Sequence, residues 1–231
     1  MAAIFSVLTI SYQSSKVYKT EMKVTINKCR RCGTCCLKGG PVLHTEDIKI
    51  IREGYAGHRH LVTLRKGEVA FNPVSNRLGQ IPEELIKITG KGKEWSCFFY
   101  DEQNTSCAMY EHRFIECRLL KCWDTSDLMH IIGRNTIVRA DLINTNDPIM
   151  KVIETHEEEC PCSEVEDLII KVSRESDNKR YLARLKEFVR KDVSIRSYAL
   201  SDLGLKKEYE LFIFGRPLKE IIESRGLTVR T

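Results

Sequence analysis

CRRCGTCC, residues 29–36, places four thiols within eight residues. Its C-x2-C-x2-C spacing is the one that wraps an iron–sulfur cluster in bacterial-type ferredoxins, where a more distant cysteine completes the ligand set. Gly33 supplies the backbone freedom that so tight a loop requires. Arg30 and Arg31 place positive charge beside the thiolates, which lowers the pKa of the thiols. The stretch therefore predicts a metal-binding loop that organises the fold around it.

Cys36 follows Cys35 directly, and this adjacency raises a question about the ligand set. Neighbouring residues in an extended chain point to opposite sides, so two such thiols seldom serve one mononuclear site. Either one of them is a spare, or the two bind different metals or clusters.

A second group of four cysteines follows within residues 97–122, in the pattern C-x9-C-x9-C-x4-C. Turn-forming residues fill DEQNTS, and aromatic residues flank several of the thiols, which suits a cluster that must be shielded from water. Eight thiols in two groups can hold two four-cysteine clusters, or one polynuclear site with spares. The predicted metal ligands are Cys29, Cys32, Cys35, Cys36, Cys97, Cys107, Cys117 and Cys122.

The identity of the metal is the next question. Structural zinc sites usually repeat C-x2-C in both halves, and the second group has no C-x2-C. The pattern therefore favours one or two iron–sulfur clusters of the 4Fe–4S type, with zinc as the alternative. A disulfide framework is the weaker interpretation, because the chain has 231 residues and lacks the features of an export signal.

Two further cysteines, in HEEECPC, leave two interpretations open. Cys160-Pro161 resembles the Cys-Pro ending of ferredoxin motifs, but Cys160 and Cys162 are equally explained as incidental thiols after an acidic run. His156 precedes them, and His44 follows the first cysteine group. A single histidine near acidic residues is more often solvated or ion-paired than a metal ligand, so neither joins the predicted set.

Composition limits the classes of function. The chain has 37 basic and 32 acidic residues, a net charge of +5, and no long basic run, so we expect no nucleic-acid partner. No apolar run approaches the ~18 residues that a membrane span requires. The opening segment, residues 1–20, resembles a first strand or a loose terminus more than a signal peptide. We therefore expect a cytoplasmic protein.

The expected fold is mainly α, with irregular metal-stapled loops and a small β element, as a single domain with a helical C-terminal extension. We place the cysteine-cluster domain at residues 24–162 and the extension at 163–231. Helices are predicted in TEDIKIIREGY (45–55), from Pro82 through Ile86, from Ser163, around residues 181–189, and from Pro217. LVTLRKGEVAF (61–71) predicts two short strands around a Lys66-Gly67 turn. MHIIGRNTIVRADLI (129–143) is ambiguous between strand and helix.

CRRCGTCC followed by KGGPVLHTEDI, then by C-x9-C and CxxYEHRxxxCR, resembles the CxxCxxCC cysteine-cluster family, also called YkgJ-like, over roughly residues 27–162. The resemblance implies zinc or iron chelation by the first seven of the eight cysteines. It supports Cys122 less, because this cysteine is less well established as a general position of the family. One departure is visible: Phe114 stands where the family usually has proline, which is expected to loosen the turn before Cys117.

Three functions follow from these observations. The favoured one is a redox or accessory iron–sulfur protein that serves a protein partner in electron transfer or maturation, alone or as a subunit of a larger complex. The second is a zinc-stapled interaction module. The third is a protein-modifying enzyme, because some family members resemble flagellin lysine N-methylases. The sequence shows no Gly-rich strand-to-helix turn of the kind that would bind S-adenosylmethionine.

Overall fold

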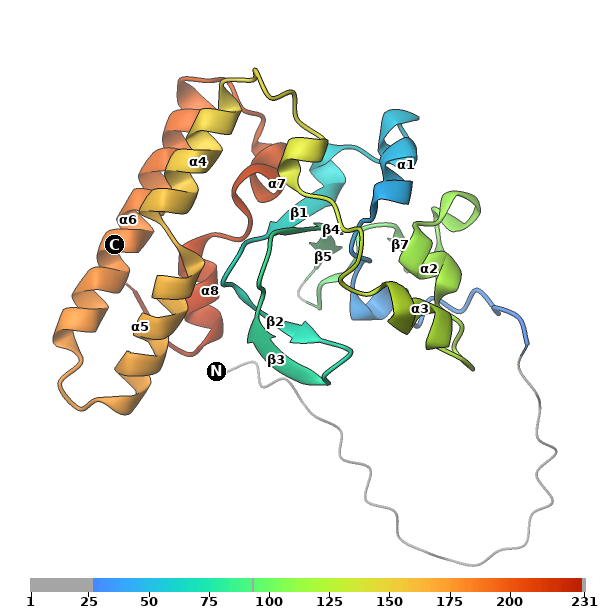
Figure 1. The fold of residues 1–231 in the computed structure, drawn as a ribbon, viewed down its shortest axis with the longest axis horizontal. Coiled ribbons are helices and arrows are strands. Elements are labelled where there is room, and N and C mark those ends of the chain that lie inside the picture. The colour runs from blue at the N-terminus through green and yellow to red at the C-terminus, as the bar shows by residue number, and fades with distance from the viewer. Residues whose placement is uncertain (1–26, 93, 230–231) are drawn as a thin grey trace, which may run out of the picture.

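The computed structural model of the protein describes residues 27–92 and 94–229 (Figure 1). Helices account for 46% of the structure and small strand pairs for 14%, which confirms the mainly α prediction at this coarse level. The strand or loose terminus expected at residues 1–20 lies outside the described residues. Among the residues that are described, no helix is both long enough and apolar enough to cross a membrane.

The described residues form eight α-helices, which Figure 1 labels. They are α1 (Ile48–Arg52), α2 (Ile115–Leu119), α3 (Ser126–Ile131), α4 (Ile149–Glu159), α5 (Cys162–Arg174), α6 (Lys179–Ser201), α7 (Glu210–Phe214) and α8 (Leu218–Ser224). Single 3-10 turns occur at Cys36–Lys38, Thr45–Asp47, His58–His60, Tyr110–His112, Arg139–Asp141 and Lys207–Tyr209.

The strands are short and form four separate antiparallel pairs. They are β1 (Leu61–Leu64) with β4 (Leu85–Ile88), β2 (Val69–Asn72) with β3 (Arg77–Gln80), β5 (Gly90–Lys91) with β6 (Ser96–Cys97), and β7 (Tyr100–Asp101) with β8 (Ser106–Cys107). Because no pair joins another within residues 27–92 and 94–229, these strands stiffen local loops rather than forming a common sheet.

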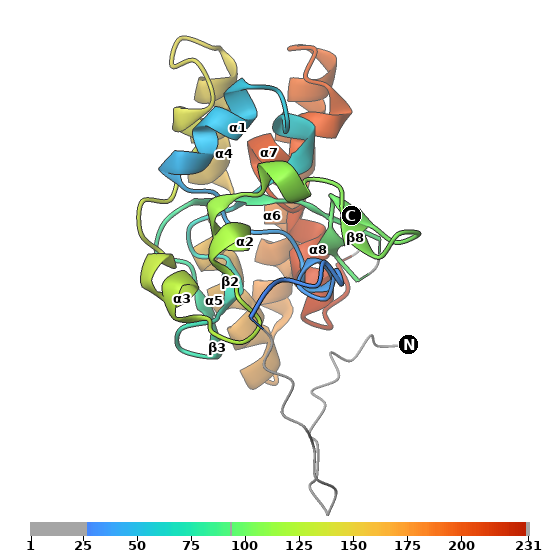
Figure 2. The ribbon, with the colours of Figure 1, turned by 90° about the vertical axis from the view of Figure 1, so that its right-hand side faces the viewer.

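The longest helices gather on one side of the molecule, and α6 packs against α4, α5 and α8. In the view of Figure 2, α1, α2 and α3 lie in front of these long helices. The helix predicted from Ser163 is confirmed as α5, which buries the apolar face that the sequence indicated. The predicted second helix is α6, separated from α5 by residues 175–178, and the helix after Pro217 is α8.

The helix predicted from Pro82 through Ile86 is wrong, because residues 85–88 form strand β4. The LIKI sequence alternates between buried and half-buried positions, and both isoleucines are fully buried. Pairing with β1, in a register that sets Leu61 opposite Ile88, satisfies the backbone of both strands. Two-residue periodicity and a cross-strand partner therefore override the helix-starting proline.

The two strands predicted in LVTLRKGEVAF are confirmed, and Gly67 makes the turn with a φ of 83°. The strands do not pair with each other, since β1 pairs with β4 and β2 pairs with β3. The β2–β3 hairpin extends from the body of the molecule (Figure 1).

The helix predicted at residues 45–55 is confirmed as a 3-10 turn that runs into α1. Its start is fixed by Asp47, whose carboxylate accepts hydrogen bonds from the backbone N–H of His44 at 3.1 Å and of Ile115 at 2.8 Å. The buried Asp47 therefore ties the beginning of α1 to the beginning of α2. The ambiguous segment 129–143 is α-helical at its start, where α3 ends at Ile131, and it contains the 3-10 turn Arg139–Asp141.

A buried network of ion pairs links the strands to the long helices. Arg65 is fully buried, and its Nε lies 2.9 and 3.0 Å from the two carboxylate oxygens of Glu157 on α4. Arg139 also binds Glu157, at 2.7 Å, and it binds Glu84 at 2.5 Å. Packing contacts also cross the predicted boundary after residue 162, because α7 packs against β1. The division into 24–162 and 163–231 stays a prediction.

His156 on α4 is fully buried beside this network, and its Nε2 lies 2.7 Å from Asp192 Oδ1 on α6. Asp192 also accepts hydrogen bonds from Arg196 Nε at 2.8 Å and from the backbone N–H of Leu218 at 3.0 Å. Burial lowers the pKa of His156 from 6.5 to about 4, against the opposing effect of Asp192. The histidine is therefore neutral in the folded protein at neutral pH.

This arrangement predicts a stability that depends on pH. The unfolded chain takes up a proton at His156 near pH 6.5, whereas the folded chain resists it until about pH 4. Stability is therefore highest above pH 6.5 and should fall by about 2 kcal/mol between pH 7 and pH 5. Urea unfolding at both pH values measures the loss, and the same difference in His156→Gln is the control. An equal loss in the variant would assign the effect to other groups.

Candidate metal centre

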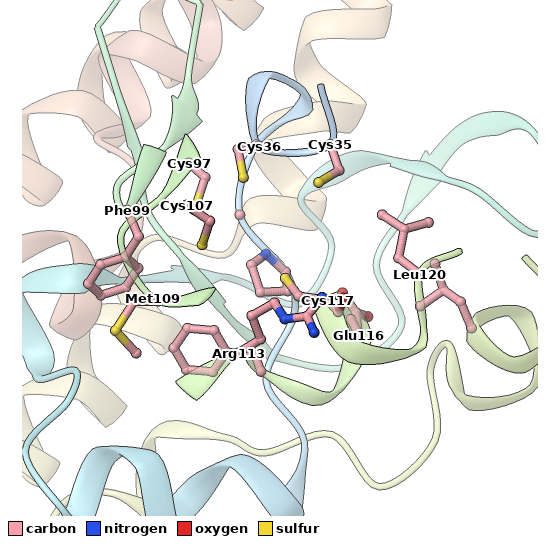
Figure 3. A pocket seen from close by; sticks show the side chains of 15 residues that line it. Cys35, Cys36, Cys97, Phe99, Cys107, Met109, Arg113, Glu116, Cys117 and Leu120 are labelled. Atoms are coloured by element: carbon pink, nitrogen blue, oxygen red, sulfur yellow. Dashed lines mark hydrogen bonds between the residues drawn. The ribbon is translucent and has the colours of Figure 1, made fainter. Parts of the chain in front are cut away.

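Five cysteines line one cavity of about 130 Å³ on the side of the molecule that carries α1, α2 and α3. They are Cys35, Cys36, Cys97, Cys107 and Cys117 (Figure 3). Apolar side chains fill much of the remaining wall, from Phe99, Met109, Phe114, Leu120 and Leu128. The structure thus brings together both cysteine groups of the sequence, although they are separated by 60 residues of chain.

Cys35 and Cys36 both line this cavity because their backbone turns as a helix. Cys35 has φ −67° and ψ −35°, and Cys36 begins a 3-10 turn. The expectation that the two thiols point to opposite sides assumed an extended chain, and it is wrong for this reason. In a helical turn, adjacent side chains diverge much less, so both can face the same space.

Cys97 and Cys107 lie at the ends of two small strand pairs, which fix their positions. Cys97 is opposite Gly90 in the β5–β6 pair, and Cys107 is opposite Tyr100 in the β7–β8 pair. The turn predicted in DEQNTS is confirmed between β7 and β8, where Asp101 Oδ1 accepts the backbone N–H of Gln103 at 3.0 Å and of Asn104 at 3.1 Å. The turn signal in the sequence thus fixes the hairpin that carries Cys107.

Cys117 lies on α2, which begins after Phe114. The Phe114 backbone has a φ of −60°, which is the value that a proline ring would fix. The expected loosening of this turn is therefore absent, because phenylalanine adopts the backbone that proline would impose. The ring of Phe114 is itself buried and forms part of the cavity wall.

Gly40 sets the close approach of the cysteine loop to β4. A Cβ at this position would lie 2.5 Å from the carbonyl oxygen of Ile88 and 2.6 Å from its Cβ. Gly40 also lines the cavity. A side chain there would therefore push Cys35 and Cys36 away from the strand that supports the opposite wall.

The thiols influence each other's ionisation strongly. Hydrogen bonding from the Cys36 thiol lowers the pKa of Cys35 to about 6 and that of Cys107 to about 7. The same two neighbours raise the pKa of Cys36, which keeps its proton. Burial, followed by the nearby thiol groups, raises the pKa of Cys117. Cys35 and Cys107 are therefore the cavity thiols that lose a proton most readily, and deprotonation of Cys36 or Cys117 requires a compensating cation.

Two cationic side chains lie beside the thiols, and the sequence analysis singled out neither. Arg113 lines the cavity, and its positive charge contributes to the lowered pKa values of Cys35 and Cys107. Lys87 is half-buried on β4, and burial lowers its pKa although Glu116 and the cavity thiols oppose this effect. The alternation of Lys87 with two buried isoleucines was the available signal, and it was missed because β4 was predicted as a helix.

Three predicted ligands lie elsewhere. Cys29, Cys32 and Cys122 are exposed, and none of them lines the cavity. Over residues 27–92 and 94–229, no three or more His, Cys, Asp or Glu side chains are arranged to hold a single metal ion. The five cavity thiols therefore surround a space rather than converge on one point.

The cysteines and histidines whose roles the sequence left open each have a structural explanation. Cys160 and Cys162 are buried in the core between α5, α6 and α8, where burial raises the pKa of each thiol to about 12. His156 is buried as a neutral side chain whose Nε2 is hydrogen-bonded to Asp192, so it is neither solvated nor ion-paired at neutral pH. His44 is buried, and its Nε2 lies 3.4 Å from Glu116 Oε1, next to Cys117 in the chain.

One of three comparisons with known proteins found a match. Residues 28–163 match the model of the CxxCxxCC family, whose description is "Putative zinc- or iron-chelating domain". The chain belongs to the CxxCxxCC family. No curated protein and no solved structure matched the chain. Family membership supports metal binding by this chain, and the matched residues include all five cavity cysteines.

The chemistry of the cavity suits a thiophilic metal. Thiolate sulfur is the ligand that zinc, copper(I) and iron–sulfur clusters share. The apolar wall limits access of water, and Arg113 supplies positive charge that offsets part of the negative charge of a metal–thiolate centre. The donor set of this CxxCxxCC protein therefore fits either zinc or an iron–sulfur centre.

The cavity assignment predicts different effects for two cysteines of the same segment. Cys117→Ser should lose bound metal and lower the melting temperature, because metal binding contributes to folding free energy. Cys122→Ser, at an exposed position outside the cavity, should keep the metal content and melting temperature of the wild type. Metal analysis and thermal unfolding of both purified variants check this. Equal metal content in the two variants would contradict the assignment.

Proposed function

We propose that the cavity holds one iron–sulfur centre, bound by four of its five cysteines, and that the protein acts in electron transfer or in the maturation of a partner. The supporting observation is the combination of five thiols with a cavity of about 130 Å³. One water molecule accounts for roughly 30 Å³ of liquid, so the space exceeds the needs of a single metal ion. Four cysteines suffice for a 4Fe–4S cluster.

The arrangement of the walls supports a protected centre with access to one side. Apolar side chains from the two residues that flank α2, from α3 and from the residues after β6 and β8 exclude water, and such shielding tunes the reduction potential of a cluster. Cys35 is exposed to solvent at the same time. Electrons would enter or leave on that side, where a partner protein can approach.

A protein partner is part of the proposal. Leu37 and Trp95 lie close in the chain to cavity cysteines, and they are 50% and 40% exposed. Apolar side chains that form a contiguous surface patch mark sites of contact with other proteins, and we propose that these two contribute to such a patch. We propose that residues 24–162 form the metal-binding unit, that residues 163–231 support it as a helical extension, and that the protein works in the reducing cytoplasm, where thiols persist.

Zinc is the alternative, and the family description names it alongside iron. A zinc site would use four thiolates at about 2.3 Å from the ion. The cavity walls would then have to close on the metal, and the protein would be a stapled interaction module. Family membership is equally compatible with both metals.

Anaerobic purification, followed by an absorption spectrum and metal analysis of the same sample, tests the proposal. We expect brown protein that contains iron and acid-labile sulfide in equal amounts. Cys97→Ser should lose the colour, because it removes a buried cavity thiol, whereas Cys122→Ser should remain brown. Colourless protein that contains zinc would refute the iron–sulfur proposal and support the interaction module.

A further inference from the structure

Two of the cysteines that do not line the cavity belong to the same loop as two that do. Cys29 and Cys32 are exposed, and Cys32 precedes Cys35 by three residues. Cys122 is also exposed, but it lies in a separate turn between Lys121 and Asp124. The first loop therefore presents an outer pair of thiols to solvent and an inner pair, Cys35 and Cys36, to the cavity.

The outer pair is held by hydrogen bonds within the loop. The backbone N–H of Arg31 donates to Cys29 Sγ at 3.4 Å, and Cys32 Sγ lies 3.2 Å from Thr34 Oγ1. Arg31 adopts a left-handed φ of 58°, which turns the chain between the two cysteines. Both sulfurs therefore have a defined setting although they are exposed.

The loop is also attached to the cavity wall. The Arg31 guanidinium carbon lies 3.8 Å from the centroid of the Tyr110 ring, and the guanidinium carbon of Arg113, which lines the cavity, lies 4.1 Å from the same centroid. Gly33 packs against the ring of Tyr100, where a Cβ would come within 2.3 Å of Cε2. The outer thiols thus sit at a fixed place beside the cavity.

The charged residues in the loop that carries the outer pair are all basic. Residues 28–38 include Lys28, Arg30, Arg31 and Lys38, and they contain no acidic residue. All four basic residues are exposed, and the charge of Arg31 is partly offset because its Nη2 lies 3.5 Å from Glu111 Oε1. A surface of this kind attracts anions and raises their local concentration. The basic surface does not attract a hydrated metal cation, whereas it does attract a metal that is bound in an anionic complex of small thiolates.

We propose that Cys29 and Cys32 receive incoming metal from an anionic complex of small thiols and pass it to the cavity cysteines. This inference rests on the proposed metal-binding function. Each step is a ligand exchange: a cysteine sulfur binds the metal and loses its proton, and the displaced carrier thiolate takes a proton up. Cys35, which is exposed and lines the cavity, is the next thiol along the loop. No electrons are transferred in these steps.

The test measures the rate at which metal is loaded separately from the amount of metal finally bound. The full chain is stripped of metal and kept anaerobic and reduced, and zinc is then supplied as its glutathione complex. Zinc is the probe because it binds thiolates and does not change oxidation state. The double variant Cys29→Ser with Cys32→Ser should load several-fold more slowly than the wild type, because it removes the thiols that make the first ligand exchanges. Its final zinc content and its resistance to a competing chelator should equal those of the wild type.

Two controls make the result specific. Cys122→Ser removes an exposed thiol outside the loop, and it should load at the wild-type rate. The charge variant Arg30→Gln with Lys38→Gln keeps both thiols, and it should load more slowly from the glutathione complex but not from aqueous zinc. Equal slowing from both zinc sources would refute the anionic carrier.

The other outcomes would each overturn either the inference or the proposed function. An unchanged loading rate in the double cysteine variant would overturn the inference and leave the cavity centre intact. A loss of final zinc content in that variant would also overturn it, because the outer cysteines would then be ligands of the final centre. A wild-type protein that binds no zinc and contains no iron would refute the proposed function itself.

Discussion

Five thiols around one cavity impose the constraint on which this side of the molecule depends, because negative charge cannot accumulate there without a cation. Cys36 stays protonated between Cys35 and Cys107, and neighbouring thiols help to raise the pKa of Cys117. A metal relieves this constraint by replacing protons with a positive centre, so metal binding and folding share free energy. The strands that carry Cys97 and Cys107 have two residues each, which is too short for independent stability. We infer that the centre stabilises the loops as much as the loops create the centre.

The helical side of the molecule supplies the rigid support. The network of Arg65, Glu157 and Arg139 connects the strand region to α4, and α7 places Phe212 and Phe214 in the same core as the cavity residues. Removing one partner of a buried ion pair leaves an uncompensated charge, so such networks favour a single arrangement. Strand β4 belongs to this core and brings Lys87 close to the thiols. The position of Lys87 therefore does not depend on bound metal.

The sequence predicted the parts of the fold that depend on local patterns. The apolar periodicity of α5, the interruption at residues 175–178 and the turn in DEQNTS all follow from neighbouring residues. The misassigned strand β4 depends instead on β1, which lies more than 20 residues away, and a single sequence does not reveal that pairing.

The candidate site was predictable as a set of residues but not as a shape. Cysteine spacing identified all five cavity thiols, yet it also included Cys29, Cys32 and Cys122, because spacing carries no information on exposure. The placement of Cys35 and Cys36 in a helical turn reversed the expectation for adjacent thiols. Arg113 and Lys87 were not predicted as part of the site, because only the folded chain brings them close to the thiols.

X-ray absorption at the metal edge of the anaerobically purified protein tests the central claim most directly, since it reports the atoms bound to the metal. The account predicts a first shell of sulfur alone, at about 2.3 Å, with iron–iron scattering beyond it. The same spectrum is expected from Cys122→Ser. A first shell dominated by nitrogen or oxygen, or protein without any bound metal, would contradict a centre held by the cavity cysteines.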